Sequence, residues 1–441
     1  MTLRFLLLAL TLLLPFSRGT AALYVDHIRG DDKNNGLSEE TAVRTIQCGV
    51  DRAEPGTTIW VYPGTYDENI VLKSGQPEKP IRLQARFPGM ARIGKPLELK
   101  PEDGSTPPVV RAQTGNARVL GVVDLRSGWM RRMASPAEVE KLAGSFFDAR
   151  KEGIVTIHLS GYPDLANVTL LGITNPGSGV RMADHTILDG LTITGFASAG
   201  VLIDKASDVE IRNCVFYANA CGIAAMGGSD IRILDNRLWR NGWENNPLWW
   251  NGRPSGYAGQ IIFNPIRGIM EHLRVENNLA AWSNGHGIRF YAGRGVKDSV
   301  VRGNVVYGSE QMGLFYKTGI HGDATAENNI AFRNTAADLR APIAVGNIVG
   351  RLANYPGNPD GWKIEKKENV NLKGGDARAL FLAPRYDDFR IAPRTPLSKT
   401  PAAEAFNRQK GGEIRFVPGS EAGTIRTGET VCVTSGNAES P

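Results

Sequence analysis

One pattern decides the fold of this chain, a glycine followed by alternating apolar residues, as in Gly200-Val201-Leu202-Ile203, Gly287-Ile288-Arg289-Phe290 and Gly313-Leu314-Phe315-Tyr316. Related segments begin at Gly179, Gly222, Gln260 and Asp338. A second landmark runs alongside the first, at intervals of 24, 22, 42, 26 and 25 residues: Gly190, Cys214, Asn236, Asn278, Asn304 and Asn329. The long interval contains an insertion, Asn241 to Tyr257. Landmarks that recur together in this way predict stacked coils of short strands, a solenoid.

The strands of such a solenoid pair in parallel, because no two-residue hairpin signal joins them. Asparagine at one recurring turn position predicts an internal ladder, in which each side-chain amide bonds the neighbouring coils. Asparagine also tolerates the left-handed backbone that such turns require. An up-and-down barrel or a sandwich is the alternative. It predicts Asn-Gly hairpins and no fixed period near 25 residues, so the parallel solenoid is favoured.

The composition is that of a folded, exported protein. Of 441 residues 51 are glycine, more than the usual share of about 7%, which favours many tight turns. Arg4, the apolar run Phe5 to Phe16 and Thr20-Ala21-Ala22 have the form of a cleaved secretory signal. We therefore expect a signal peptide over 1–22, a β-helix domain with a cap and insertions over 23–400, and a polar tail over 401–441. Export predicts a periplasmic or secreted protein.

The cysteines and charges exclude several classes. Cys214 and Cys221 are near enough in sequence to bridge, and two buried thiols are the alternative. The formal charge is +6, and +4 once Arg4 and Arg18 are removed with the signal (6 − 2). No nucleotide-binding or metalloprotease motif occurs. We predict no cofactor, no metal site, no nucleic-acid partner, no membrane span and a monomer. Calcium binding stays an open alternative, although the sequence contains no clear cluster of calcium ligands.

Several motifs resemble secreted right-handed parallel β-helix proteins of the pectate-lyase-like superfamily. The asparagine ladder and the glycine-led coils are two of them. The opening Arg44-Thr45-Ile46-Gln47, Pro55-Gly56-Thr57 and Pro63-Gly64-Thr65-Tyr66 resembles the N-terminal cap of those proteins, and Asp388 to Leu397 resembles their final coil. The resemblance implies an all-β, right-handed parallel β-helix with a capping helix, Thr45 to Ala53. It is specific for the fold, which hosts lyases, hydrolases, epimerases and adhesins.

A solenoid aligns equivalent positions of successive coils, so its surface is readable from the sequence. With the recurring glycine as zero, offsets +1 and +3 are apolar and are expected to face the core, whereas +2 and +4 face out. The +2 column contains Arg181, Leu202, Ala224, Ile262, Arg289, Phe315 and Arg340. The +4 column contains Ala183, Asp204, Met226, Asn264, Tyr291, Lys317 and Pro342. Neighbouring coils lie about 4.8 Å apart, so these columns predict which side chains meet.

The predicted site is the place where basic and polar groups converge in these columns. Lys317, Tyr291, Arg289 and His286 are the candidate catalytic residues. Candidate substrate-binding residues are Asn264, Arg181, Arg340, Trp249, Trp250, Arg253 and His321. The tryptophans belong to the insertion, and an exposed indole stacks well on a sugar ring. Each group also has a structural alternative: a solvated lysine, a tryptophan pair that packs the loop, a histidine in a turn.

The charge of the cluster favours an acidic polysaccharide as partner and β-elimination as reaction. Elimination needs a cation at the uronate carboxylate, for which Arg289 and Asn264 are suited, and a base, for which Lys317 or Tyr291 is suited. Hydrolysis needs two carboxyl groups about 5–9.5 Å apart, and the columns offer Asp204 alone. A hydrolase with carboxylates such as Asp184 or Glu244, a C5-epimerase and a noncatalytic carbohydrate-binding protein stay open.

Overall fold

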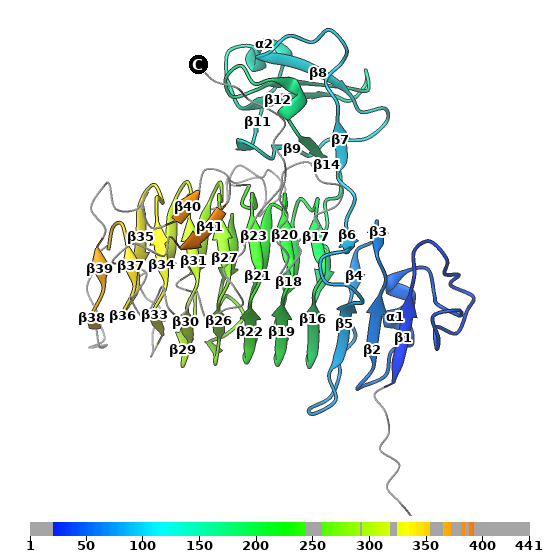
Figure 1. The fold of residues 1–441 in the computed structure, drawn as a ribbon, viewed down its shortest axis with the longest axis vertical. Coiled ribbons are helices and arrows are strands. Elements are labelled where there is room, and N and C mark those ends of the chain that lie inside the picture. Colours follow the sequence, from blue (N-terminus) through cyan, green and yellow to red (C-terminus); the bar gives the residue numbers. More distant parts are fainter. Residues whose placement is uncertain are drawn as a thin grey trace, which may run out of the picture.

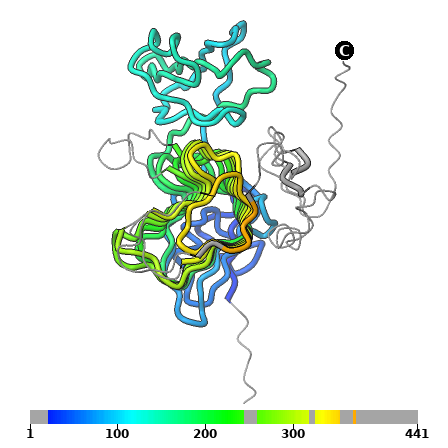
Figure 2. The backbone as a smooth tube through the Cα atoms, turned by 90° about the vertical axis from the view of Figure 1, so that its left-hand side faces the viewer, coloured from blue at the N-terminus to red at the C-terminus, as the bar shows by residue number. Residues whose placement is uncertain are grey.

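The computed structural model describes residues 21–243, 258–291, 293–317, 324–352, 365–371, 381–383 and 388–391. In this part the chain is a right-handed parallel β-helix, as predicted, with three long sheets that run the length of the stack (Figure 1). Seen along the stack in Figure 2, successive coils superimpose closely. The asparagine-ladder period thus predicted the coil length correctly.

The three sheets are each parallel throughout. The eleven-stranded sheet consists of β1 (Ala22–Val25), β2 (Thr58–Val61), β5 (Ile81–Ala85), β16 (Thr186–Asp189), β19 (Val209–Arg212), β22 (Ile231–Leu234), β26 (Arg274–Glu276), β30 (Val300–Arg302), β33 (Thr325–Glu327), β36 (Ile343–Val345) and β38 (Glu365–Lys367). The ten-stranded sheet consists of β3 (Gly64–Tyr66), β6 (Ala91–Ile93), β17 (Thr192–Thr194), β20 (Val215–Tyr217), β23 (Arg237–Trp239), β27 (Leu279–Ala281), β31 (Val305–Tyr307), β34 (Ile330–Phe332), β37 (Ile348–Val349) and β39 (Val370–Asn371). The eight-stranded sheet consists of β4 (Ile70–Val71), β15 (Val180–Arg181), β18 (Ala199–Ile203), β21 (Cys221–Ala225), β24 (Gly259–Phe263), β28 (His286–Phe290), β32 (Met312–Tyr316) and β35 (Ala337–Arg340).

Alternating apolar side chains fill the inside of the stack. Offsets +1 and +3 of the repeat belong to one buried core, as predicted; Ile288, Phe290 and Leu314 are fully buried examples. The rings of Phe263, Phe290 and Tyr316 stack on consecutive coils, with centroids 4.5 and 4.3 Å apart. Identical positions therefore stack along the solenoid, and this fixes the register of each new coil on the one before it.

The predicted asparagine ladder is present between the eleven- and ten-stranded sheets. The backbone N–H of Asn236 donates to Oδ1 of Asn278, that of Asn278 to Asn304 and that of Asn304 to Asn329, at 2.9, 2.9 and 3.0 Å. The left-handed backbone, however, falls on the residue before each ladder asparagine, for example Asn277 (φ 63°) before Asn278. The expectation that the ladder asparagine itself takes that conformation was wrong. Asparagine is needed at these positions for the hydrogen bonds of its side-chain amide, not for its backbone conformation.

A second ladder lies at the turn before the eight-stranded sheet, and the sequence pattern did not predict it. The backbone N–H of Asn219 donates to Oδ1 of Asn241, and Nδ2 of Asn241 donates to Oε1 of Gln260, at 3.0 and 2.6 Å. On later coils the N–H of Ser309 donates to Oδ1 of Asn334 at 2.9 Å. The residue type changes from coil to coil, which hid this ladder in the sequence.

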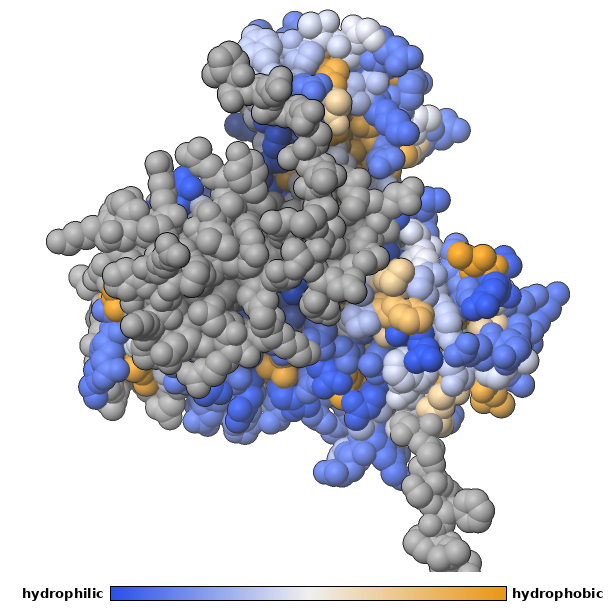
Figure 3. All heavy atoms as spheres, viewed as in Figure 1, coloured by the Kyte–Doolittle hydropathy of each residue, from blue (hydrophilic) through white to orange (hydrophobic). Residues whose placement is uncertain are grey.

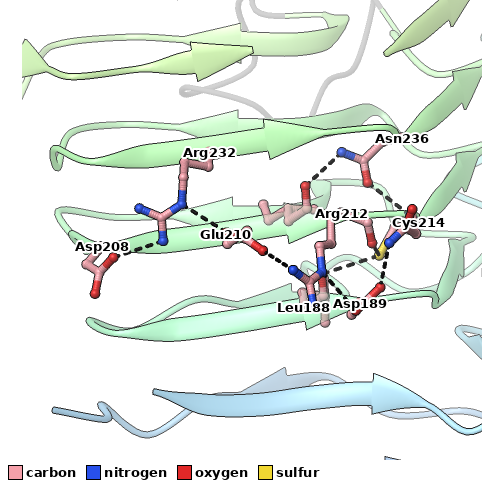
Figure 4. A network of polar contacts seen from close by, with 10 residues as sticks. Leu188, Asp189, Asp208, Glu210, Arg212, Cys214, Arg232 and Asn236 are labelled. Carbon is pink, nitrogen blue, oxygen red and sulfur yellow. Dashed lines mark hydrogen bonds and ion pairs between the residues drawn. The ribbon is translucent and has the colours of Figure 1, made fainter. Parts of the chain in front are cut away.

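The outward face of the eleven-stranded sheet carries a chain of ion pairs (Figure 4). Arg212 contacts Asp189 and Glu210, at 2.8 and 2.7 Å, and Arg232 contacts Glu210 and Asp208, at 2.9 and 3.0 Å. Where the described residues are visible, Figure 3 likewise shows mainly hydrophilic side chains over the outside of the solenoid.

Cys214 and Cys221 are buried free thiols, and burial raises the pKa of Cys214 to about 12. The buried-thiol alternative is therefore the one observed.

Helix α1 (Ile46–Arg52) lies where the sequence predicts a helix. Thr45 is its N-cap, and the Glu68 carboxylate accepts the N–H groups of Ile46 and Gln47, at 2.9 and 3.0 Å. The helix contacts β1, β2 and β4, and its side chains Ile46 and Val50 join the solenoid core. Its role as the cap of the coil stack stays a prediction.

Residues 97–173 leave the solenoid after β6 and return before β15, and we call them the inserted module (Figure 1). Its two sheets are largely antiparallel and consist of β7 (Leu97–Leu99), β8 (Val109–Gln113), β9 (Gly121–Asp124), β10 (Gly128–Trp129), β11 (Arg131–Arg132), β12 (Ser145–Ala149), β13 (Ile154–His158) and β14 (Leu170–Ile173), with α2 (Pro136–Val139) and a 3-10 turn at Leu165–Asn167. The sequence has a helical pattern over 134–150, but only α2 is helical in this stretch, and Ser145–Ala149 forms β12, which pairs with β13. Outside the module, β25 (Met270–Glu271) pairs with β29 (Val296–Lys297), and β40 (Phe381–Ala383) with β41 (Asp388–Ile391).

The module packs on the ten-stranded sheet through an apolar cluster. Trp129 of the module stacks on Trp243, with ring centroids 5.1 Å apart and planes 6° from parallel. The indole Nε1–H of Trp129 donates to the carbonyl of Arg240, and the backbone N–H of Trp129 donates to Oδ1 of Asn284, both at 3.0 Å. Asn284 lies two residues before β28, so the module borders the strand that carries His286 and Arg289.

Candidate functional site

The eight-stranded sheet has the register on which the site prediction depends. Strand pairing places Arg181, Leu202, Ala224, Ile262, Arg289, Phe315 and Arg340 in one column, each opposite the next. The coil that begins at Gln260 lacks the glycine of its neighbours, yet Ile261 pairs with Ile223 and with Ile288, as the alignment requires. The predicted +2 column is therefore correct.

The +4 positions follow the strands directly. The backbone N–H groups of Asn264, Tyr291 and Lys317 bond to carbonyls of the preceding coil, those of Ala225, Phe263 and Phe290, at 2.7, 2.8 and 2.9 Å. The three residues thus occupy equivalent places on consecutive coils, one residue beyond β24, β28 and β32. We call Asn264, His286, Arg289, Tyr291 and Lys317 the cationic cluster.

Arg289 is the centre of the cationic cluster. Its guanidinium carbon lies 3.9 Å from the ring centroid of Tyr291 and 5.4 Å from that of Phe315. Nη1 of Arg289 also donates a hydrogen bond to Nε2 of His286. The guanidinium is therefore held between two aromatic faces and an imidazole, an arrangement that fixes its plane.

His286 is a neutral imidazole in this setting. Burial lowers its pKa to about 3, and the neighbouring Arg289 charge acts in the same direction. A guanidinium only donates, so Nε2 of His286 accepts from Arg289 and Nδ1 must carry the proton. Nδ1 is buried and has no hydrogen-bond partner within the described residues. His286 thus presents a buried N–H donor and is unsuited to act as a base near neutral pH.

The cluster is more enclosed than an outward-facing column suggests. Asn264, His286 and Tyr291 are only 2%, 4% and 7% exposed. Arg289 is half-buried, and Lys317 is exposed. Nδ2 of Asn264 is a second buried donor without a hydrogen-bond partner in the described part of the chain. Two buried N–H donors and a fixed guanidinium favour binding of an oxygen-rich anion.

The remaining predicted residues lie apart from the cluster or outside the described residues. Arg340 continues the +2 column beyond Phe315, with its guanidinium carbon 5.1 Å from that ring, whereas Arg181 lies at the opposite end of the column. Trp249, Trp250, Arg253 and His321 fall outside the described residues, as does Glu244. The functional roles assigned to all these residues stay predictions.

Phe315 is the contact that sequence reasoning missed. Its ring stacks on His286, with centroids 5.8 Å apart, and it separates the guanidinium groups of Arg289 and Arg340. The signal was available, because Phe315 stands between these arginines in the +2 column. Phe315 is only 6% exposed, so its ring is covered although its position in the strand alternation faces outward.

Two of the candidate carboxylates for hydrolysis lie on other coils and contact other groups. Asp204 contacts Arg181 and Arg267, at 3.8 and 3.5 Å, and Oδ1 of Asp184 accepts the backbone N–H of Ser207 at 2.8 Å. Among the residues that the structure describes, no three His, Cys, Asp or Glu side chains gather to hold a metal ion. None of the described helices is long and apolar enough to cross a membrane.

Comparison with known proteins agrees with this architecture. The family described as "Right handed beta helix region" matches residues 153–336. Pectate lyase PEL9 of Emericella nidulans is 23% identical over 393 residues, which cover 81% of this chain and 84% of that protein.

Two solved structures are similar in fold. One is pectate lyase Pel9A, with 14% identity, coverage of 86% of this chain and 91% of that chain, and a TM-score of 0.47. The other is XylC in complex with xylose, with 14% identity, coverage of 76% and 70%, and a TM-score of 0.48. The matched region and the register of the three sheets agree that this chain is a right-handed parallel β-helix, and the curated relative makes it similar to a pectate lyase.

Proposed function

We propose that the protein binds a uronate-containing polysaccharide at the cationic cluster and cleaves it by β-elimination. The observation that carries this proposal is the position of Arg289, whose guanidinium is fixed by His286, Tyr291 and Phe315. The similarity to a pectate lyase supports the same substrate class. The apolar run at the N-terminus supports action outside the cytoplasm.

In the proposed reaction, Arg289 and the buried N–H donors of Asn264 and His286 bind the carboxylate at C5 of the sugar. Fixed positive charge at that place stabilises the carbanion that develops when the C5 proton is removed. We assign proton removal to Lys317, because its side chain is exposed whereas Tyr291 lies under the guanidinium. Tyr291 is the alternative base.

The bond changes balance without a further reagent. The base takes the proton from C5, the electron pair forms the C4–C5 double bond, and the C4–O bond breaks. The leaving oxygen takes a proton, either from the protonated base or from water, and becomes the new hydroxyl end of the departing chain. The other product carries an unsaturated uronate, which absorbs ultraviolet light.

The test is a screen of acidic polysaccharides for the absorbance of an unsaturated uronide. Lys317→Ala is expected to lower turnover about 100-fold or more if Lys317 is the base, and Tyr291→Phe to do so if Tyr291 is. Lys297→Ala is the matched control, since Lys297 is a half-exposed lysine on β29, paired with Glu271. The assignment fails if both cluster variants keep near-normal rates on a polymer that the wild type cleaves.

Other outcomes of the screen point to other functions. New reducing ends without absorbance identify a hydrolase, whose carboxylates would then be sought at Asp204, Asp184 or Glu244. Exchange of the C5 hydrogen without cleavage identifies an epimerase, which shares proton removal but not the leaving group. Binding without any product identifies a noncatalytic carbohydrate-binding protein.

A further inference from the structure

A second group of charged side chains lies on the first coils of the eight-stranded sheet. Arg181 belongs to β15, Asp204 directly follows β18, and Arg267 lies in the loop after β24. The Asp204 carboxylate is 3.8 Å from Arg181 and 3.5 Å from Arg267. The side chains of Arg181, Asp204 and Arg267 are 53%, 31% and 51% exposed, so this triad is accessible to solvent.

The ion pairs of the triad are loose. Both distances exceed the 2.7–3.2 Å of a good N–H···O hydrogen bond, and half-exposed pairs of this kind add little stability. Oδ1 of Asp204 is a buried atom that accepts no hydrogen bond from the described residues. Two guanidinium groups face one carboxylate, so among the described residues one positive charge of the triad has no second carboxylate beside it. The triad therefore offers donors, an acceptor and a net positive charge.

The triad also has an apolar floor. Leu202 stands beside Arg181 in the strand register, and Met226 occupies the position equivalent to Asp204 on the next coil. Both side chains are half-buried. Arg267 approaches Gly227, the residue after Met226, so closely that a Cβ atom on Gly227 would lie 2.8 Å from Cβ of Arg267. An apolar floor rimmed by charged groups matches a sugar ring, whose C–H face is apolar and whose edge is polar.

The triad and the cationic cluster are nearest at Asp204 and Asn264, which are equivalent positions two coils apart and so about 10 Å from each other. Four strand spacings of about 4.8 Å lie between Arg181 and Arg289 in the +2 column, a distance of about 19 Å. Ala224 and Ile262, which stand between them, are fully buried. A ligand that reaches both places must therefore be an oligosaccharide of several rings.

We propose that Arg181, Asp204 and Arg267 form a second sugar subsite, which binds a uronate residue of the polysaccharide at a distance from the cleavage site. The guanidinium groups of Arg181 and Arg267 bind the sugar carboxylate, and Asp204 accepts a sugar hydroxyl. This subsite rests on the proposed function for its substrate class, but its binding is measurable whether or not the polymer is cleaved.

The test compares variants by titration calorimetry with a long oligouronate, a uronate disaccharide and a neutral oligosaccharide. Arg181→Gln and Arg267→Gln are each expected to weaken binding of the long oligouronate about tenfold, the loss of one charge-assisted hydrogen bond. In both variants, the affinity for the uronate disaccharide, which binds at the cationic cluster, is expected to stay unchanged. The affinity for the neutral oligosaccharide is also expected to stay unchanged. Arg274→Gln is the matched control, because it removes one exposed charge from β26 of the eleven-stranded sheet.

The outcomes separate the subsite from the reaction. If the wild type cleaves a polymer and both triad variants bind and cleave it as well as Arg274→Gln does, the subsite is refuted and the proposed function stands. If the wild type binds the long oligouronate through Arg181 and Arg267 but yields no product, the subsite stands and the lyase assignment fails. In a cleaving wild type, the variants are expected to raise KM for long substrates and leave kcat unchanged.

Discussion

The asparagine ladder makes a quantitative prediction about stability at Asn278. Its side chain is 1% exposed and bonds to both neighbouring coils. Oδ1 accepts from the backbone N–H of Asn236 at 2.9 Å, and Nδ2 donates to the carbonyl of Ile233 at 2.8 Å. Asn278→Ala leaves the buried backbone N–H of Asn236 without this partner, whereas the Ile233 carbonyl keeps its place in the parallel ladder of β22 and β26. At about 1–3 kcal/mol for an orphaned buried group, the free energy of unfolding is expected to fall by about 1–3 kcal/mol.

The measurement is urea denaturation followed by circular dichroism, with wild type, Asn278→Ala and a control compared under one condition. Asn167→Ala is the control, since its exposed amide makes a surface hydrogen bond to Asp164 within the inserted module. We expect that control to change the free energy by no more than about 0.5 kcal/mol. A loss below about 1 kcal/mol for Asn278→Ala would mean that the ladder amides do not satisfy buried backbone groups as described.

Two further predictions concern the module and the ion-pair chain. Trp129→Ala removes the stack on Trp243 and a hydrogen bond to Arg240, so it is expected to lower the free energy of unfolding by about 2–3 kcal/mol and to speed proteolysis of the inserted module. Tyr162→Ala, which changes an 83% exposed residue, is the control and is expected to do neither. Equal proteolysis rates for the two variants would contradict the packing of the module on the solenoid. The hydrogen bond from His185 and the guanidinium of Arg232 lower the pKa of the Asp208 carboxyl below its ordinary 3.8. Because the folded-state pKa is the lower one, the stabilisation by Asp208 is complete above pH 3.8 and is lost as the pH falls through the folded-state value. The stability difference between wild type and Asp208→Asn, measured by urea denaturation at several pH values, should therefore be present at neutral pH and vanish in acid, and a difference independent of pH would contradict it.

Much of the fold was readable because a solenoid repeats its constraints. Ile288 pairs with Ile261 on one neighbouring coil and with Leu314 on the other, so a buried position on one coil predicts a buried position on the next. The same logic placed Arg289 beside Phe315 and put Tyr291 and Lys317 at equivalent places on consecutive coils. The sequence repeat therefore predicts contacts well where equivalent positions of successive coils stack on one another.

The parts that escaped prediction carry no period. The inserted module has its own antiparallel pairing, so nothing in the coil pattern announces its strands. The enclosure of Asn264 and His286 was missed for another reason. Alternation along a strand tells which side of the sheet a residue faces, but not how much of the rest of the protein packs over that side. The orientation of Arg289 likewise depends on three-dimensional contacts with His286 and Tyr291.

The most direct test of the central claim is the ultraviolet absorbance of wild type and Arg289→Ala with the acidic polysaccharide that gives the strongest signal in the screen. Arg289 is expected to hold the carboxylate before and during proton removal, so its loss should raise KM and lower kcat together. The account predicts a clear rise in absorbance with the wild type and almost none with Arg289→Ala, while both proteins unfold at the same urea concentration. Equal rates for the two proteins, or cleavage of the polymer without any absorbance, would contradict it.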